Sequence, residues 1–180
     1  MSDARNYTAG WICAISTEHA AAQDVLDEEH PGPNYVTAHD HNDYTLGRIG
    51  LHNVVIAVLP DGEHGTDSAA GVARDMLHSF TNIRMGLIVG VGNGAPGPSR
   101  DIRPGGAAES SPVHEKGALS RMILGKRCKI GRNFEHTRIL NQPPTLLRTA
   151  GGCLQARHEA QDHSLSALVG EALDESPTEE

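Results

Sequence analysis

The chain has 180 residues, a length that suits one domain of ordinary size and is short for two. Its 15 lysines and arginines against 23 aspartates and glutamates give a formal net charge of −8. This balance argues against binding to nucleic acid or to an anionic membrane surface, because both need clustered basic side chains. Only 38% of the residues are apolar and 3% are aromatic, so the chain is leaner in core-forming side chains than an average domain.

The remaining composition predicts a reduced, intracellular protein, and we expect a cytoplasmic location. No apolar run approaches the roughly 20 residues of a membrane helix, and the polar amino terminus has no signal-peptide core behind it. Cys13, Cys128 and Cys153 are odd in number and far apart, which indicates neither a disulfide framework nor a zinc site. The histidine cluster at residues 39–41 lies in a polar segment and is interpreted as solvated, so no metal is expected.

The first hundred residues alternate between strand and helix patterns. In chain order we predict a strand over 8–16, a helix over 18–29, strands over 43–49 and 54–59, a helix over 66–80 and a strand over 85–91. A Pro-Gly-Pro run at residues 31–33 forbids continuation of the first helix. Strands and helices in this order imply an α/β fold, with a mixed or parallel sheet between helices.

The second half of the sequence is less regular. Residues 92–106 are rich in glycine and proline, and residues 107–131 follow neither the strand nor the helix period and are enriched in lysine and arginine. Helices are predicted over 146–160, after a Pro-Pro start, and over 164–173. We therefore predict a single domain over 7–175, irregular at 107–131, followed by an acidic disordered tail at 176–180.

Glu18 stands where the first predicted strand passes into the first predicted helix. A carboxylate there lies at the carboxyl end of a sheet strand, where open α/β sheets bind their ligands. It also gains from the positive amino end of the helix. The alternative is an ordinary first-turn glutamate, which stabilises its helix by roughly a few tenths of a kcal/mol.

The loop at residues 61–66 connects a predicted strand to the second long helix. Gly62 and Gly65 permit close approach to the backbone, and the helix start at Thr66 offers free N–H groups to an anion or a sugar hydroxyl. These three are candidate binding residues. The alternative is a well-formed strand-to-helix turn with Thr66 as the helix cap.

A second glycine loop leaves the strand predicted over 85–91. Residues 92–97 formally match the Gly-x-Gly-x-x-Gly dinucleotide pattern, but prolines interrupt the expected helix start and no ribose-binding acid follows at the right distance, so we reject the match. A loop shaped around a small ligand fits better. Its candidate binding residues are Gly90, Gly92, Asn93 and Gly94. Residues 100–103 add two cations and a carboxylate beside this loop, or form a solvated turn.

Seven segments, quoted as they stand in this chain, together carry a family resemblance. They are residues 7–22 (YTAGWICAISTEHAAA), 44–50, 54–65, 73–77, 86–96, 101–103 and 134–144. In this combination the chain resembles the fungal nucleoside phosphorylase-like domains of the purine nucleoside and uridine phosphorylase superfamily, over residues 7–106 and 132–175. Such domains often precede nucleotide-binding and ankyrin or tetratricopeptide regions.

The resemblance implies a three-layer α/β/α sandwich with a central mixed sheet, and cleavage of the N-glycosidic bond of purine nucleosides by phosphate or water. This chemistry needs an acid for the departing base, contacts to the ribose and a placed nucleophile. Glu18 matches the carboxylate that activates water in the methylthioadenosine nucleosidase branch. The Gly-x-x-x-Arg phosphate loop of the phosphorolytic branch is not present here, which favours hydrolysis. Asn93 replaces a usual glycine and tolerates a positive φ.

The same resemblance implies the remaining expectations about ligands and partners. The ligand is a small-molecule nucleoside, with no cofactor, and phosphate is a possible co-substrate. A homo-oligomer is possible for this superfamily. Neither nucleic acid nor a membrane is expected as a partner, which follows from the negative net charge and not from the resemblance.

The chain departs from its relatives in two places. Residues 104–110 lack the β-branched strand of related domains, and residues 121–126 read RMILGK where relatives carry Tyr-Asp-Phe/Leu-Gly-Lys. We hypothesise that residues 106–131 were translated in a shifted frame. The ribose-gripping Met-Glu pair and the base-protonating Asp of relatives have no counterpart, so we expect a C-terminally truncated domain. The alternatives are an inactive ligand-binding or sensor domain, and a gene-model fragment.

Overall fold

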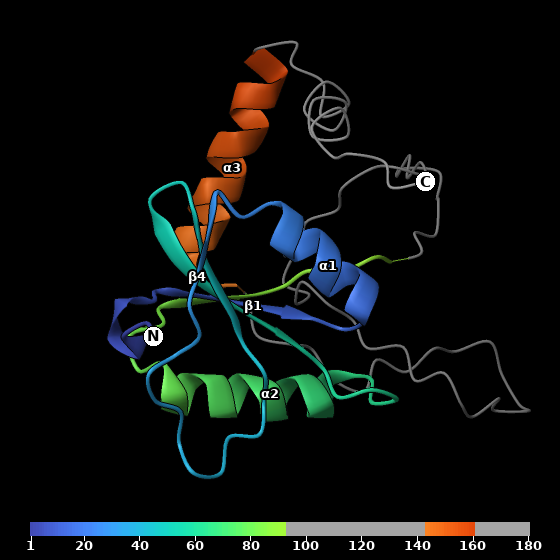
Figure 1. The fold of residues 1–180 in the computed structure, drawn as a ribbon. Helices are drawn as coiled ribbons and strands as arrows, with labels where there is room; N and C mark the ends of the chain where they lie inside the picture. The colour runs from blue at the N-terminus through green and yellow to red at the C-terminus, as the bar shows by residue number, and fades with distance from the viewer. Residues whose placement is uncertain (93–142, 161–180) are drawn as a thin grey trace, which may run out of the picture. The chain divides into compact units, whose positions relative to one another are not determined.

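The computed structural model describes residues 1–92 and 143–160. Its contacts divide the chain into two units, residues 1–96 and 97–180. The first unit is an α/β structure built on one mixed sheet (Figure 1). The described part of the second unit is a single helix, α3 (Thr145–Ala160), close to the helix predicted over 146–160. Predictions for residues 93–142 and 161–180, including the frame-shift hypothesis and the tail, lie outside the described residues.

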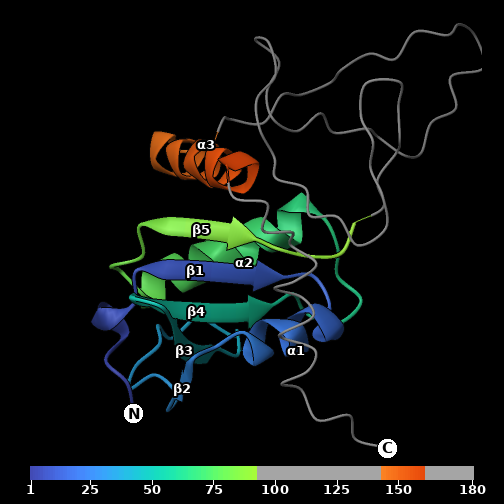
Figure 2. The same cartoon turned by 90° about the horizontal axis from the view of Figure 1, so that it is seen from above.

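The sheet has five strands in the order β2-β3-β4-β1-β5 (Figure 2). Their bounds are β1 (Ala9–Cys13), β2 (Glu28–His30), β3 (Thr45–Ile49), β4 (His52–Val58) and β5 (Met85–Ile88). β1 pairs in parallel with β4 on one side and with β5 on the other, so Trp11 lies opposite Ile56 and Leu87. β3 and β2 extend the sheet beyond β4 by antiparallel pairing. Three strands therefore have their carboxyl ends at the same edge.

A short 3-10 helix, η1 (Ala4–Asn6), precedes β1, and the α-helices α1 (Ser16–Asp24) and α2 (Thr66–Ser79) lie on opposite faces of the sheet. Side chains alternate along a strand, and in β4 Val54 and Ile56 pack in one cluster with Ala22 of α1. Val55 and Ala57 point the other way, into a cluster that includes Val72 and Met76 of α2. Because helices cover both faces of β4, its side chains are apolar on both faces and do not alternate between apolar and polar.

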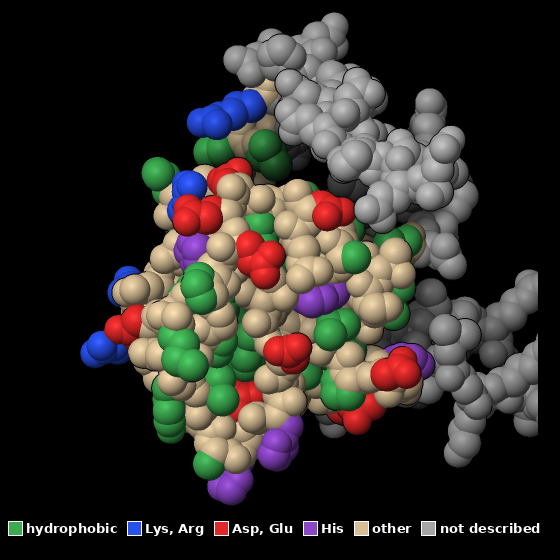
Figure 3. Space-filling model, in the orientation of Figure 1, with side chains coloured by type: hydrophobic (Ala, Val, Ile, Leu, Met, Phe, Trp, Pro, Cys, Tyr) green, Lys and Arg blue, Asp and Glu red, His purple; other side chains and the backbone are tan. Residues whose placement is uncertain are grey.

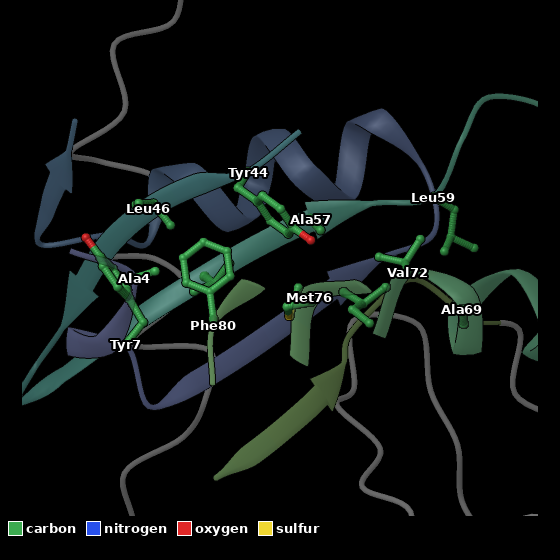
Figure 4. Close-up of a cluster of buried hydrophobic side chains, with 12 residues drawn as sticks. Ala4, Tyr7, Tyr44, Leu46, Ala57, Leu59, Ala69, Val72, Met76 and Phe80 are labelled. Carbon is green, nitrogen blue, oxygen red and sulfur yellow. The ribbon is translucent and has the colours of Figure 1, made fainter. Parts of the chain in front are cut away.

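The larger cluster centres on Phe80, which is fully buried directly after α2 (Figure 4). Its ring meets Tyr7 and Tyr44 edge-to-face, with centroids 5.8 and 5.0 Å away. Such aromatic pairs contribute about 0.5–1.5 kcal/mol beyond the area they bury. Three aromatic rings from separate segments therefore anchor a chain that is poor in aromatic residues.

A buried carboxylate connects the loop before β3 to the end of α2. Asp40 Oδ2 accepts hydrogen bonds from the Tyr44 hydroxyl at 2.8 Å and from Ser79 Oγ. Asp40 Oδ1 accepts from the backbone and side-chain nitrogens of Asn42. Burial raises the pKa of Tyr44, so its hydroxyl keeps its proton and remains a donor.

The α/β fold class predicted from the sequence is confirmed, with two corrections in the first fifty residues. The helix predicted over 18–29 ends at Asp24, and the short strand β2 follows, which the sequence analysis did not predict. The chain turns because Asp27 N–H donates to the Arg48 carbonyl of β3 and begins strand pairing there. The strand predicted over 8–16 is also shorter, since α1 already begins at Ser16.

Candidate functional site

The site is built on the edge where β1, β4 and β5 end. α1 begins three residues after β1, α2 begins after the loop that follows β4, and a glycine-containing segment follows β5. Because these three strands are parallel, Glu18, the loop at residues 61–66 and Gly90 all follow carboxyl ends at one edge. The fold thus places the predicted features where α/β sheets bind ligands.

Glu18 is held by three backbone N–H groups. Its Oε2 accepts from Ala14 at 2.7 Å and from Ile15 at 3.3 Å, and its Oε1 accepts from Val91 at 2.7 Å. Ile15 is the N-cap of α1, and its apolar side chain has no oxygen with which to cap the helix. Glu18, three residues on, supplies the carboxylate half of a capping box and also binds the segment after β5.

The contact between Glu18 and the segment after β5 requires a glycine at position 90. A Cβ on Gly90 would lie 2.5 Å from Glu18 Oε1 and 2.8 Å from Glu18 Cδ, closer than real Cβ contacts. Val89 N–H still pairs with the Ile12 carbonyl of β1 at 3.2 Å, so Gly90 directly follows the last sheet bond of β5. The structure therefore brings two of the candidate residues, Glu18 and Gly90, into contact.

The backbone donors decide the charge of Glu18. Desolvation acts to raise its pKa, but the N–H groups of Val91, Ala14 and Ile15 outweigh this effect, so the pKa of Glu18 lies below its ordinary value. Glu18 is therefore ionised at neutral pH, where it accepts hydrogen bonds and cannot donate a proton.

Cys13, at the end of β1, is fully buried beside this charge. Burial, and then the negative charge of Glu18, raise the pKa of the Cys13 thiol to about 11. The thiolate is the reactive form of cysteine, so Cys13 is not a nucleophile at neutral pH.

The loop at residues 61–66 has the backbone conformation that its glycines predict. Gly62 has φ 77° and Gly65 φ 93°, a region that other residues rarely adopt. One sequence interpretation is wrong: Gly65, not Thr66, is the N-cap of α2, and Thr66 is its first helical residue. Among the described residues, no hydrogen bond joins this loop to Glu18; Glu63 instead accepts from Ser68 Oγ at 2.6 Å.

The other candidates are placed only in part. Gly92 is exposed and is the last described residue of the first unit. Asn93, Gly94 and residues 100–103 lie outside the described residues. The backbone N–H groups that hold Glu18 were not predicted from the sequence; a glutamate three residues after an N-cap position was the available signal for one of them, the N–H of Ile15.

A cavity of about 360 Å³ lies elsewhere, between α2 and β5. Its lining includes Gly10, Met76, Leu77 and Ile88, and it contains none of the candidate residues. The candidate residues at the carboxyl edge and this apolar cavity are therefore separate features. Within the described ranges, no group of three or more histidine, cysteine or acidic side chains is placed to hold a metal ion.

Carboxylates are dispersed over the face of the molecule shown in Figure 3, and basic side chains are few on it. At the carboxyl edge, Asp61, Glu63 and Asp67 add to the charge of Glu18. Arg5 and Arg84 precede β1 and β5 and so belong to the opposite edge. Among the described residues, no helix is both long and apolar enough to cross a bilayer.

The fold and the site together define a class of protein. It is an α/β protein with a mixed sheet, in which an ionised carboxylate is held by backbone N–H groups where the parallel strands end. The chain is similar to a nucleotide-binding leucine-rich repeat (NLR)-like protein of Hyaloscypha variabilis, with 43% identity over 174 residues. The match covers 97% of this chain and 17% of that protein's length. No family model matches the chain, and no solved structure matches it.

Proposed function

We propose that the chain is a nucleoside phosphorylase-like domain that cleaves the N-glycosidic bond of purine nucleosides. The observation that carries the proposal is Glu18, an ionised carboxylate fixed by three backbone N–H groups at the edge where β1 and β5 end. The proposal includes completion of the mixed sheet as a three-layer α/β/α sandwich, an intracellular, cytoplasmic location, and assembly as a homo-oligomer.

An ionised carboxylate suits the charge that develops in this reaction. As the bond between the anomeric carbon and the base nitrogen breaks, the ribosyl ring becomes positively charged, and a fixed negative group nearby stabilises it. Since the pKa of Glu18 is lowered, Glu18 serves as acceptor for a ribose hydroxyl or a water molecule. It is not the acid that protonates the base, and that proton has to come from another group or from solvent.

The relative from Hyaloscypha variabilis supports the proposal that this chain is one domain of a larger protein. Domains of the family that the sequence resembles often precede nucleotide-binding regions, and the relative from Hyaloscypha variabilis is named an NLR-like protein. A chain that spans 17% of that protein corresponds to one part of a larger architecture there. This agrees with a nucleoside-recognising domain within such a protein.

The test is release of free base by the full chain. Adenosine and inosine are incubated with the protein, with and without phosphate, and the base is separated by chromatography. We expect release by the wild type and none by Glu18→Gln, which keeps the shape and removes the charge. The control Glu63→Gln removes a charge from the same edge, outside the backbone-bound cluster, and should retain activity. If the wild type releases no base under either condition, the chain does not catalyse this reaction.

A second candidate function is nucleoside binding without turnover, as an interaction or sensor domain. It is favoured by the occupation of both Glu18 oxygens by backbone donors, which leaves the carboxylate less free to act on a water molecule. Calorimetric binding of adenosine or inosine without base release would select this function over catalysis. Light scattering on the same sample would test the proposed oligomer.

A further inference from the structure

β5 lies at one edge of the sheet and exposes apolar side chains. It is the last strand on its side (Figure 2), and within the described residues no strand pairs with its outer edge. Ile88 is 74% exposed, Leu87 38% and Val89 41%. An open edge strand is a template for pairing with another strand, and proteins usually cover such an edge or place charges on it. The outer edge of β5 carries neither device among the described residues, so it is a candidate interaction surface.

The pairing of β5 with β1 decides which backbone groups face outward. Val89 N–H donates to the Ile12 carbonyl of β1 at 3.2 Å. Neighbouring residues of a strand direct their backbone groups to opposite sides, so Gly86 and Ile88 direct theirs away from β1. Both residues are exposed. A strand added to this edge would therefore bond to the N–H and C=O groups of Gly86 and Ile88.

The cavity between α2 and β5 opens beside the same two residues. Ile12, the register partner of Ile88, packs in the cluster on the α2 side of the sheet, so Gly86 and Ile88 also face α2. The cavity has a volume of about 360 Å³ and both residues line it. A Cβ added to Gly86 would meet nothing within 4 Å. The edge thus has an open space at Gly86 and, two residues further on, an isoleucine that is largely exposed.

We propose that β5 pairs antiparallel with β5 of a second copy of this chain, about a two-fold axis at Leu87, so that the two sheets become one. In this register each Ile88 lies opposite Gly86 of the other copy, on the α2 side, and fills the apolar cavity there. A two-fold interface uses the same surface twice, and strand addition is a recurring mode of recognition. The inference rests on the homo-oligomer included in the proposed function, and it does not depend on the cleavage reaction.

The shape of the edge favours a second copy as the partner. Antiparallel pairing about Leu87 bonds the outward backbone groups of Gly86 to those of Ile88 in the other copy, and the reverse. The residue without a side chain therefore meets the large exposed one on both sides of the axis. A shift by one residue would turn Ile88 away from the cavity, because side chains alternate between the faces of a sheet.

The charges at the two ends of β5 favour the same partner. Arg84 precedes β5, is exposed and has no ion-pair partner among the described residues. At the other end the Glu18 carboxylate lies against Gly90. Antiparallel pairing places Arg84 of each copy opposite Gly90 of the other, and so beside its Glu18. Opposite charges then meet at both ends, which offsets part of the repulsion between two chains of net charge −8.

The first test is the association of the full chain, measured by sedimentation over a range of concentrations. A strand-to-strand contact is small, and interfaces under about 1,200 Å² form weak complexes, so we expect a dimer that forms as concentration rises. Ile88→Lys should weaken association by at least about tenfold, because it removes apolar burial and adds like charges near the axis. Leu51→Lys is the matched control: Leu51 is 98% exposed at the turn between β3 and β4, and its substitution should leave association unchanged.

A second pair of variants tests the charges. Arg84→Gln should weaken association, because each copy loses the cation that meets Glu18 of the other. Arg48→Gln removes the same charge from β3, which β4 and β1 separate from β5, and should have no such effect. Equal association of the two variants would contradict the antiparallel arrangement.

Cross-linking tests the register without depending on a destabilising substitution. In this pairing the two Leu87 residues form a pair without hydrogen bonds, with Cα atoms about 4.5 Å apart, a distance that suits a disulfide. Leu87→Cys, with Cys128 and Cys153 replaced by serine, should give a covalent dimer on mild oxidation. Ile88→Cys in the same background should cross-link more slowly, because its two copies lie diagonally, about 7–8 Å apart. Faster cross-linking of Ile88→Cys would contradict the register.

The outcomes separate this inference from the proposed function. A wild type that stays monomeric at every concentration contradicts both the inference and the proposed homo-oligomer, and shows that another partner or another part of the chain covers β5. A dimer that Ile88→Lys does not weaken, or in which Leu87→Cys does not cross-link, contradicts the inference while the homo-oligomer stands. Release of free base from adenosine or inosine decides the cleavage reaction in each case.

Discussion

Glu18 and Val91 are 73 residues apart in the chain, and the Val91 N–H group donates to Glu18 Oε1 at 2.7 Å. The bond joins the start of α1 to the segment after β5 across the end of β1. Since the two strands are neighbours only in the folded sheet, this contact exists only in the folded state. It therefore couples the protonation of Glu18 to the stability of the fold.

The first prediction concerns the pH dependence of stability. The pKa of Glu18 is lower in the folded protein than its ordinary value of 4.5, so the unfolded chain binds the proton more readily. The stabilisation is complete above pH 4.5 and is lost as the pH falls through the lower folded pKa. Urea unfolding of wild type and Glu18→Gln from pH 7 to 3 should show a difference that shrinks in acid. A difference that stays constant with pH would contradict the link to Glu18.

The second prediction uses two glycines. Gly90→Ala should destabilise the protein by about 1 kcal/mol, because the new Cβ displaces the Glu18 carboxylate and breaks a charge-assisted bond. Gly71→Ala is the control: it lies within α2, and a Cβ there meets nothing within 4 Å. It should stabilise the protein by roughly 0.5–1 kcal/mol through helix propensity. Equal effects of the two substitutions in urea unfolding would exclude the close contact at position 90.

The sequence predicts those helices and strands in which apolar side chains follow a regular pattern. β4 and α2 were predicted within two residues, because a continuous apolar run and a helical apolar stripe both reflect burial. β2 was missed because its side chains give no such signal: Glu28 and Glu29 are exposed, and the strand is held by backbone pairing with β3.

In the candidate site, too, only the features that depend on local sequence could be predicted. Glu18 was predicted from its place between a strand and a helix, which is local information. Its bond to Val91 was not, because every residue except proline carries a backbone N–H, and only the parallel pairing of β1 with β5 brings this one near. Spatial partners that act through their backbone leave no mark in the sequence.

The third prediction concerns thiol reactivity. Cys13 is fully buried with a pKa of about 11, whereas Cys153 on α3 is exposed. In the native protein at pH 7.5, an alkylating reagent should label Cys153 readily and Cys13 at least tenfold more slowly, since roughly one unit of pKa is a tenfold change in thiolate. Mass spectrometry of the peptides measures both sites, and labelling in urea should make them comparable. Rapid native labelling of Cys13 would contradict its burial.

The fourth prediction concerns the buried carboxylate Asp40. Ser79→Ala removes one of its hydroxyl donors, which joins the loop before β3 to the end of α2, and should cost about 1–3 kcal/mol of unfolding free energy. Ser68→Ala is the control, because within the described residues the Ser68 hydroxyl donates to the exposed Glu63, and its loss should cost under about 0.5 kcal/mol. Denaturant unfolding at pH 7 measures both. Equal costs would show that the Asp40 contacts do not hold the loop against α2, and the larger cost at Ser79 would show that they do.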